Sequence, residues 1–478
     1  MKILKALLWL PVWGALGVLT GATGAAEPPP ASLDVDEAVR IALRQNYAYQ
    51  QAGAVVGMAE GSRLDAAAGL LPSAGGSYSY SKSSSATTLK NLDVETRIEN
   101  GLPIVVQRGS LQLDTDRSGS GLGVSLREDL SFSNWYRYRS AQADVEGARH
   151  GQAAAGQDLA YQVRQQFYLL LRAQDLLQVQ TEDFRLAQDQ ERRITSMFEL
   201  GSVARVDVLK AKVRVSEAEL ALIRQQNLVD IEKARLATLL GFSADTPLEL
   251  TGELRTAAAP LDSAEVVIQS ASRADLERAR ERVRSASNLY RSALLSRVPG
   301  LFATFDWSTS AGSEQSDNLN QQLLTDVPNP GDSTLALYAF PTDSDAESDG
   351  WDLRVGASVN LDAFLNMGQH KRSRSFMHQA EYELEGLQLD VQREIEEAIL
   401  NYRASQKAIE SAESGVASAE EDLRLSQERY QQGLGTVLEL LEAQVAITRA
   451  RNNRVNALTG LKISEAALDK ARGAPLPD

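Results

Sequence analysis

The sequence predicts an α+β membrane protein in which very long coiled-coil helices alternate with pairs of antiparallel strands. Three observations lead to this prediction. The two halves of the chain resemble each other, each half contains a helical pattern of unusual length, and short segments alternate apolar and polar residues. The N-terminal segment is considered first, because it is expected to be absent from the mature chain.

The first 26 residues have the features of a secretory signal peptide. Lys2 and Lys5 precede an apolar stretch from Leu7 to Leu19, and small residues follow up to Ala26. The apolar stretch is short for a membrane span and is interrupted by Pro11. We therefore assign residues 1–26 to a signal peptide and expect the mature chain to leave the cytoplasm.

The composition excludes several classes of protein. The chain has no cysteine, so it offers no disulfide, no thiolate chemistry and no N-terminal lipidation site. It has only three histidines, and its net charge of −15 disfavours nucleic-acid binding. No nucleophile-and-base set, phosphate loop or metal-ligand spacing is present, so we expect no catalytic residue, no cofactor and no metal site. The prediction is that the protein is not an enzyme.

The two halves of the chain share one layout. Gly201, Leu209, Ala211 and Val213 recur as Gly433, Leu441, Ala443 and Val445 at a fixed offset of 232 positions. Pro72 and Pro299 occupy matching places further upstream. These correspondences predict a first repeat over 27–241, a linker over 242–262, a second repeat over 263–473 and a short tail over 474–478.

Each repeat is expected to contain a first helix and then a long helical hairpin. The first helices cover roughly 34–70 and 263–298, and each stops before a proline. The long helices begin near Trp135 and Met367 and continue for about 60 residues, or roughly 90 Å, to the glycine turns. Apolar residues such as Leu159, Val163, Phe167 and Leu170 recur at the spacing of coiled-coil packing.

Two strands are expected between the helices of each repeat. In Trp351–Leu361 apolar residues alternate with polar ones, and Leu122–Arg127 shows the same alternation. This pattern suits a half-buried soluble strand as well as a strand that faces lipid on one side. The secretory signal and the lack of another core favour the lipid-facing alternative. Residues 82–118 and 311–350, which are polar and rich in Ser, Asp and Gly, are predicted to be mobile loops.

Four strands are too few to close a transmembrane barrel, because single-chain barrels begin at eight. The prediction is therefore a shared antiparallel β-barrel to which each copy contributes four strands. The long helices would continue its wall as a coiled-coil barrel.

The chain resembles TolC-like outer membrane factors. The resemblance rests on Leu33–Asn46, on Gly69–Ser73 before the first strand, and on the Gly433 turn leading into Leu438–Gln444. It covers essentially the whole mature chain and implies a homotrimer with a twelve-stranded barrel in the outer membrane lipid and a periplasmic helical tunnel. It also implies docking to a periplasmic adaptor and an inner-membrane pump, which would supply the energy for efflux or type I secretion.

The resemblance also assigns roles to the two turns. The periplasmic tips, expected to dock the adaptor, comprise Gly201, Ser202, Val203, Ala204, Arg205, Gly433, Leu434, Gly435 and Thr436. A periplasmic gate would consist of the acids Glu439 and Glu442 and of the interhelix partners Asp207 and Tyr430. A tip arginine of some members falls at Gly435, so that ionic link is missing here, and Arg205 could take its place.

Simpler roles exist for the same residues. Thr436 and Glu439 fit a capping box, in which the N-cap threonine is paired with a glutamate three residues later. Tyr430 could be a packed aromatic residue before a turn. The competing classes for the whole chain are a periplasmic coiled-coil adaptor, a structural coiled coil and a secreted enzyme.

Overall fold

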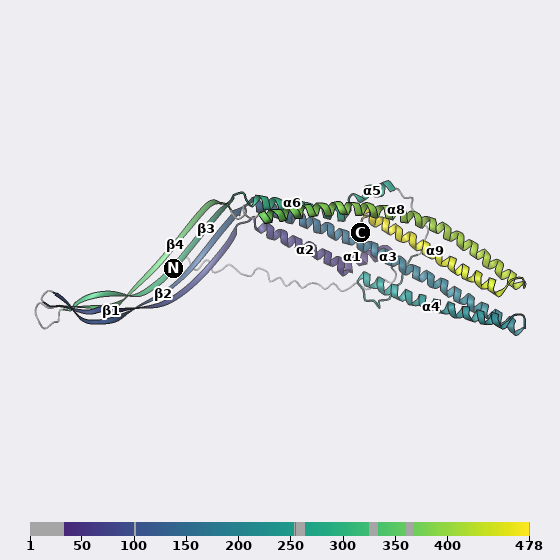
Figure 1. Cartoon of the computed structure of the whole chain (residues 1–478), viewed down its shortest axis with the longest axis horizontal. Coiled ribbons are helices and arrows are strands. Elements are labelled where there is room, and N and C mark those ends of the chain that lie inside the picture. Colours follow the sequence, from purple (N-terminus) through teal and green to yellow (C-terminus); the bar gives the residue numbers. More distant parts are fainter. Residues whose placement is uncertain are drawn as a thin grey trace. The chain divides into compact units, whose positions relative to one another are not determined.

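The computed structural model describes residues 33–99, 102–252, 254, 263–324, 333–359 and 367–477 (Figure 1). The signal peptide assigned to 1–26 and most of the expected linker after residue 254 lie outside these ranges. The chain divides into two compact units. The helical unit lies within 1–54, 150–276 and 387–478, and the strand unit lies within 55–149 and 277–386.

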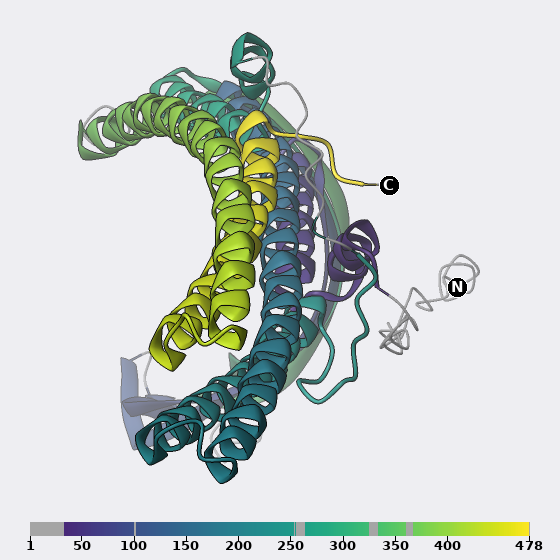
Figure 2. The ribbon, with the colours of Figure 1, turned by 90° about the vertical axis from the view of Figure 1, so that its right-hand side faces the viewer.

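The expected long helices are confirmed. α3 (Phe132–Glu199) has 68 residues and α8 (Met367–Gln431) has 65. Each is followed by a 36-residue helix, α4 (Arg205–Leu240) and α9 (Val437–Arg472) respectively. In the helical unit, the α3–α4 hairpin lies beside the α8–α9 hairpin, and both turns are at the same end (Figures 1 and 2).

Each expected first helix is present but divided. The first is α1 (Val35–Gln45) and α2 (Tyr47–Ala68), and the second is α5 (Ser263–Ser270) and α6 (Ala274–Leu295). Asn46 separates α1 from α2 because its backbone is extended and its Oδ1 accepts from the N–H groups of Ala48 and Tyr49. Its Nδ2 donates to the carbonyl of Leu239, which joins this break to α4.

The core of the helical unit follows the apolar spacing of α3. Leu159, Val163, Phe167 and Leu170 are all buried, in one cluster with residues of α1 and the end of α4. This confirms the coiled-coil pattern read from the sequence. No helix among the described residues combines the length and the apolar character needed to cross a membrane.

The strand unit contains four antiparallel strands in the order β1–β2–β3–β4. They are β1 (Ser73–Glu99), β2 (Leu102–Leu130), β3 (Gly300–Leu324) and β4 (Ser333–Ser358). The end of β1 also pairs with the start of β4, over Glu95–Ile98 and Ser333–Ala336.

The prediction of mobile loops over 82–118 and 311–350 was wrong for the described residues. Paired strands run through both segments, as in the pairing of Ser83 with Arg117 and of Ser313 with Asp345. The polar composition of these segments led to the wrong prediction because strand pairing depends on backbone hydrogen bonds. A sheet exposed to water on both faces needs no apolar alternation.

Candidate functional site: the hairpin tips and the apolar face of the sheet

The two hairpin turns have the same backbone geometry. Gly201 has a φ of +76° and Gly433 a φ of +74°, values that favour glycine. Beyond each glycine, a backbone N–H reaches back to the helix: Ser202 donates to Met197 over 2.8 Å, and Leu434 donates to Arg429 over 2.8 Å. This Schellman-type pattern satisfies carbonyls that the helix ends leave unpaired.

Most of the predicted tip residues are exposed at the two turns. Gly201, Ser202, Ala204, Arg205, Gly433, Leu434 and Thr436 are exposed, whereas Val203 and Gly435 are half-buried. Leu200 was not predicted, yet it is 81% exposed at the end of α3, and Leu434 is 69% exposed at the other turn. Each tip therefore presents an apolar side chain to its surroundings.

Thr436 caps α9, as the capping box predicts. Its Oγ1 accepts from the backbone N–H of Glu439 over 3.2 Å. Glu439 lies in the first turn of α9, where the helix dipole favours a negative charge. The capping role of Thr436 is confirmed and leaves the carboxylate of Glu439 free for other contacts.

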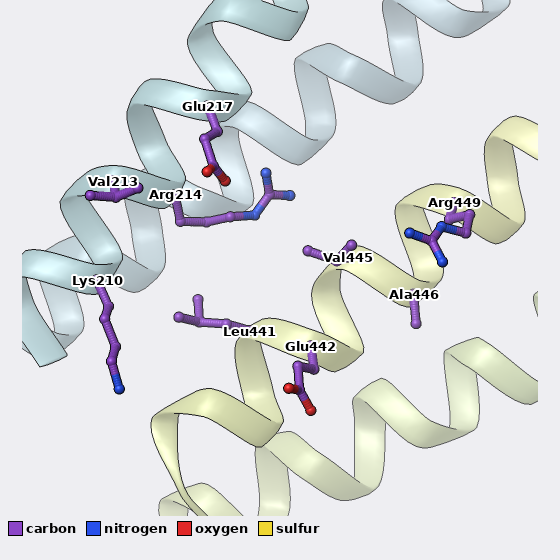
Figure 3. A pocket seen from close by; sticks show the side chains of 9 residues that line it. All are labelled: Lys210, Val213, Arg214, Glu217, Leu441, Glu442, Val445, Ala446 and Arg449. Carbon is purple, nitrogen blue, oxygen red and sulfur yellow. The ribbon is translucent and has the colours of Figure 1, made fainter.

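Glu442 lies one turn further along α9 and lines a groove between α4 and α9 (Figure 3). The groove has a volume of about 340 Å³. Its cationic side chains are Lys210, Arg214 and Arg449. Glu442 itself is exposed, and its three-residue spacing from Glu439 places both acids on one side of α9.

Tyr430 joins the two hairpins at their tips. It packs with Val203 and Leu441 against a buried cluster, whose members are Ile194, Val208, Ala211 and Val437. Its hydroxyl donates to Sδ of Met197 over 3.5 Å. The pKa of Tyr430 is raised by burial and, to a smaller extent, by the negative charge of Asp207. The structure thus brings Tyr430 near Asp207, and the hydroxyl itself is bound to Met197, which the sequence reading missed.

Gly435 has a steric role at the second tip. A Cβ added there would approach Cβ of Arg429 and the backbone nitrogen of Tyr430 to 3.2 Å. An arginine at this position would therefore require the end of α8 to move. Arg429 lies on the other side of the turn, and its guanidinium is 3.8 Å from the carboxylate of Glu439. The cation beside Glu439 is thus Arg429, a residue that the sequence analysis did not single out.

The sheet of the strand unit carries apolar residues in register on one face. Val124 on β2 is paired with Trp307 on β3, which is paired with Trp351 on β4. The next row on that face is Leu126, Phe305 and Leu353. All six side chains are at least 36% exposed. We call these two rows the apolar band.

The apolar band is part of a longer apolar face. Along β2 this face includes Leu122 and Leu130, which are exposed, but Glu128 interrupts it between Leu126 and Leu130. The uninterrupted apolar residues of β2, from Leu122 to Leu126, span about 14 Å at 3.4 Å per residue.

Paired helical hairpins with glycine turns, together with a sheet whose apolar face is uncovered, are features of outer-membrane channel proteins. The chain belongs to the outer membrane efflux protein family, whose sequence profile matches residues 38–242 and 268–474. The outer membrane efflux protein BepC of Brucella suis biovar 1 (strain 1330) is 22% identical over 378 residues, which cover 78% of this chain and 76% of that protein.

Solved outer-membrane channels share the fold at low sequence identity. The structure of CusC has a TM-score of 0.71 at 18% identity, with 93% of each chain covered. The CmeC outer membrane channel of Campylobacter jejuni has a TM-score of 0.70 at 14% identity, with 95% of this chain and 90% of that chain covered. The open-state MtrE channel of Neisseria gonorrhoeae has a TM-score of 0.69 at 15% identity, with 92% and 89% covered.

Proposed function

We propose that the protein is a homotrimeric, passive exit duct in the outer membrane, serving a tripartite efflux or type I secretion system. In this assembly three four-stranded sheets form one twelve-stranded transmembrane barrel, and the helices form a periplasmic tunnel. The observation that carries the proposal is the apolar band, because its tryptophans and leucines are uncovered within the chain and match the needs of a lipid-facing surface.

A second exposed apolar surface supports the oligomer. On α4, Leu209, Val213, Leu220 and Ile223 are 47–59% exposed and recur at steps of four, seven and three residues. This spacing is typical of a coiled-coil seam that faces a partner helix. Val213 lines the α4/α9 groove, yet all four side chains stay about half exposed among the described residues of the helical unit, so a neighbouring copy is the natural occupant.

The two tips are the proposed docking surface for a periplasmic adaptor, which connects the duct to an inner-membrane pump. Leu200, which precedes Gly201, and Leu434, which follows Gly433, supply exposed apolar contacts there. The duct itself has no proposed energy source, since transport is driven by the pump.

The tips also form the proposed gate. Around a threefold axis, Glu439 and Glu442 would form two stacked rings of carboxylates, which favour cations and limit conductance. At the same level Tyr430, which lies near Asp207, holds the hairpins together through its packing and its bond to Met197, and Tyr430→Phe is expected to lower the energy of opening.

Single-channel recording of the purified oligomer in a planar bilayer tests the proposed function. A stable, low-conductance and cation-preferring pore is the expected result. A Trp307→Asp/Leu353→Asp variant should fail to insert, because charges in the apolar band oppose transfer into lipid. If well-folded parent oligomer and the Glu439→Ala/Glu442→Ala variant both formed no pore, the duct would be rejected in favour of an adaptor or structural role.

A further inference from the structure

The polar contacts between the α3–α4 hairpin and the α8–α9 hairpin differ between the base and the tip of the hairpins. Near the base, Arg164 on α3 pairs with Asp469 on α9 over 3.1 Å, and Lys470 pairs with Asp158 over 2.8 Å. At the tip, the polar contact is the weak Tyr430–Met197 bond, since a thioether sulfur is a poor acceptor. Among the described residues, the base of this seam is therefore held by ion pairs, whereas the tip end is not.

A buried ion pair lies between these two regions. The carboxylate of Asp183 on α3 accepts from Nη2 of Arg214 on α4, at 2.6 Å to Oδ1 and 2.8 Å to Oδ2. The Asp183 side chain is 5% exposed and the Arg214 side chain 14%. This charge-assisted pair lies entirely within the α3–α4 hairpin, so it fixes the carboxylate in place whatever the other hairpin does.

The second hairpin binds to this carboxylate through one hydroxyl. Oγ1 of Thr448 on α9 donates to Oδ1 of Asp183 over 2.7 Å. The same hydroxyl lies 3.0 Å from the carbonyl of Gln444, one turn earlier in its own helix. A threonine hydroxyl has a single proton, so it can donate fully to only one of these acceptors at a time.

This pair of acceptors makes the contact reversible at low cost. When α9 moves away, the Thr448 hydroxyl can turn to the Gln444 carbonyl, and Asp183 keeps its guanidinium partner. Neither arrangement leaves the Thr448 hydroxyl or the Asp183 carboxylate without a partner, so the usual penalty for breaking a buried polar contact is avoided at these two groups. The contact is short enough to hold α9 against the first hairpin and is still easily released.

We propose that Thr448 and Asp183 form a latch, with Arg214 as the residue that positions Asp183, and that the latch holds α9 against the first hairpin when the tips are closed. The latch rests on the proposed function only in its effect on the pore. Release of the latch allows α9, with Glu439 and Glu442 at its start, to move relative to α4.

The structural part of the latch can be tested without a channel. The chain lacks cysteine, so spin labels at Glu217→Cys on α4 and Arg449→Cys on α9 would be unique. Both positions line the α4/α9 groove (Figure 3). In oligomers assembled with excess unlabelled chain, Thr448→Val should broaden the distance distribution and extend it to longer distances, and Thr448→Ser should restore it.

A matched control is available on the same helix. Thr459 is 2% exposed, and its hydroxyl donates only within α9, to the carbonyl of Val455 over 2.9 Å. Thr459→Val should leave the distance distribution unchanged. Equal distributions in the parent, Thr448→Val and Asp183→Asn would overturn the latch.

The effect on the pore is measured in the same variants. Thr448→Val should raise the open-to-closed ratio of single channels about tenfold, the effect of losing one hydrogen bond to a charged acceptor. Thr448→Ser and Thr459→Val should behave like the parent. A broadened distance distribution with unchanged open probability would overturn the role of the latch in gating. If the parent and the Glu439→Ala/Glu442→Ala variant both formed no pore, the proposed duct would fail, and the spin-label result would still decide the latch.

Discussion

Arg429 and Glu439 face each other across the turn between α8 and α9, with the guanidinium 3.8 Å from the carboxylate. Both side chains are about half exposed, so the pair contributes little to folding. The pair instead affects the net charge of the tip, because the guanidinium of Arg429 offsets the negative charge of Glu439 in the proposed carboxylate rings.

Removing this cation should change ion selectivity. We expect Arg429→Ala to make the pore more cation-selective, seen as a larger reversal potential in a salt gradient. Arg429→Lys should remain close to the parent because it keeps the charge. An unchanged reversal potential in Arg429→Ala would show that the side chain does not face the conduction path.

The acids themselves should limit conductance. Replacing Glu439 and Glu442 together by Ala is expected to raise single-channel conductance and to weaken block by divalent or trivalent cations, because the rings attract these ions. Glu413→Ala, an exposed change in the middle of α8, is the control. If the double variant kept the parent's conductance and block, the constriction would lie elsewhere.

Two glycines of one helical hairpin should respond in opposite directions to the same substitution. Gly433→Ala places a Cβ on left-handed backbone and should destabilise the fold by about 1–2 kcal/mol. Gly415→Ala, within α8, should stabilise it by about 0.5–1 kcal/mol, because alanine favours the helix. Neither added Cβ would have a neighbour within 4 Å, so the contrast isolates backbone conformation. Melting temperatures of the two variants that shift in the same direction relative to the parent would contradict this prediction.

A buried cation in the helical unit should be costly to remove. Arg273 is 6% exposed, pairs with Asp275 and Glu394 at 2.8 Å, and donates to the carbonyl of Ala471. Arg273→Met should destabilise the unit by about 3–5 kcal/mol, because it leaves Asp275 without its guanidinium partner and removes the donor to the Ala471 carbonyl. Arg393→Met, which removes two exposed ion pairs on α8, should change the melting temperature little. Similar melting temperatures for the two variants would contradict this ranking.

The stability of the helical unit should fall in alkali. Burial raises the pKa of Tyr168, and the nearby charge of Glu465 raises it further. The folded state therefore keeps the phenol proton above about pH 10, where the unfolded state loses it, so stability decreases as pH rises through this window. The melting temperature of Tyr168→Phe should depend less on pH between 9 and 12 than that of the parent. Tyr47→Phe, an exposed control, should follow the parent.

The regular features of the fold could be predicted from the sequence. The spacing of Leu159, Val163 and Phe167 indicated the coiled-coil face, and Gly201 and Gly433 indicated the turns, because both signals are local. The break at Asn46 was missed because it depends on a side-chain amide that bonds both its own helix start and α4.

Contacts between residues far apart in the chain could not be predicted from the sequence. The bonds from Tyr430 to Met197 and from Thr448 to Asp183 join residues more than 230 positions apart, and no periodicity in the sequence reports them. The tip acids and turn residues were inferred through family resemblance, whereas Arg429 became visible only when the turn brought it near Glu439.

The length of the strands has a consequence for the cell surface. β1 contains 27 residues, which at about 3.3 Å per residue corresponds to roughly 90 Å, about three times the thickness of a hydrocarbon layer. In the proposed duct, much of the sheet would therefore stand outside the lipid as a stem of paired strands. Proteases cleave best where the backbone is unpaired and mobile, so this stem should resist digestion on intact cells.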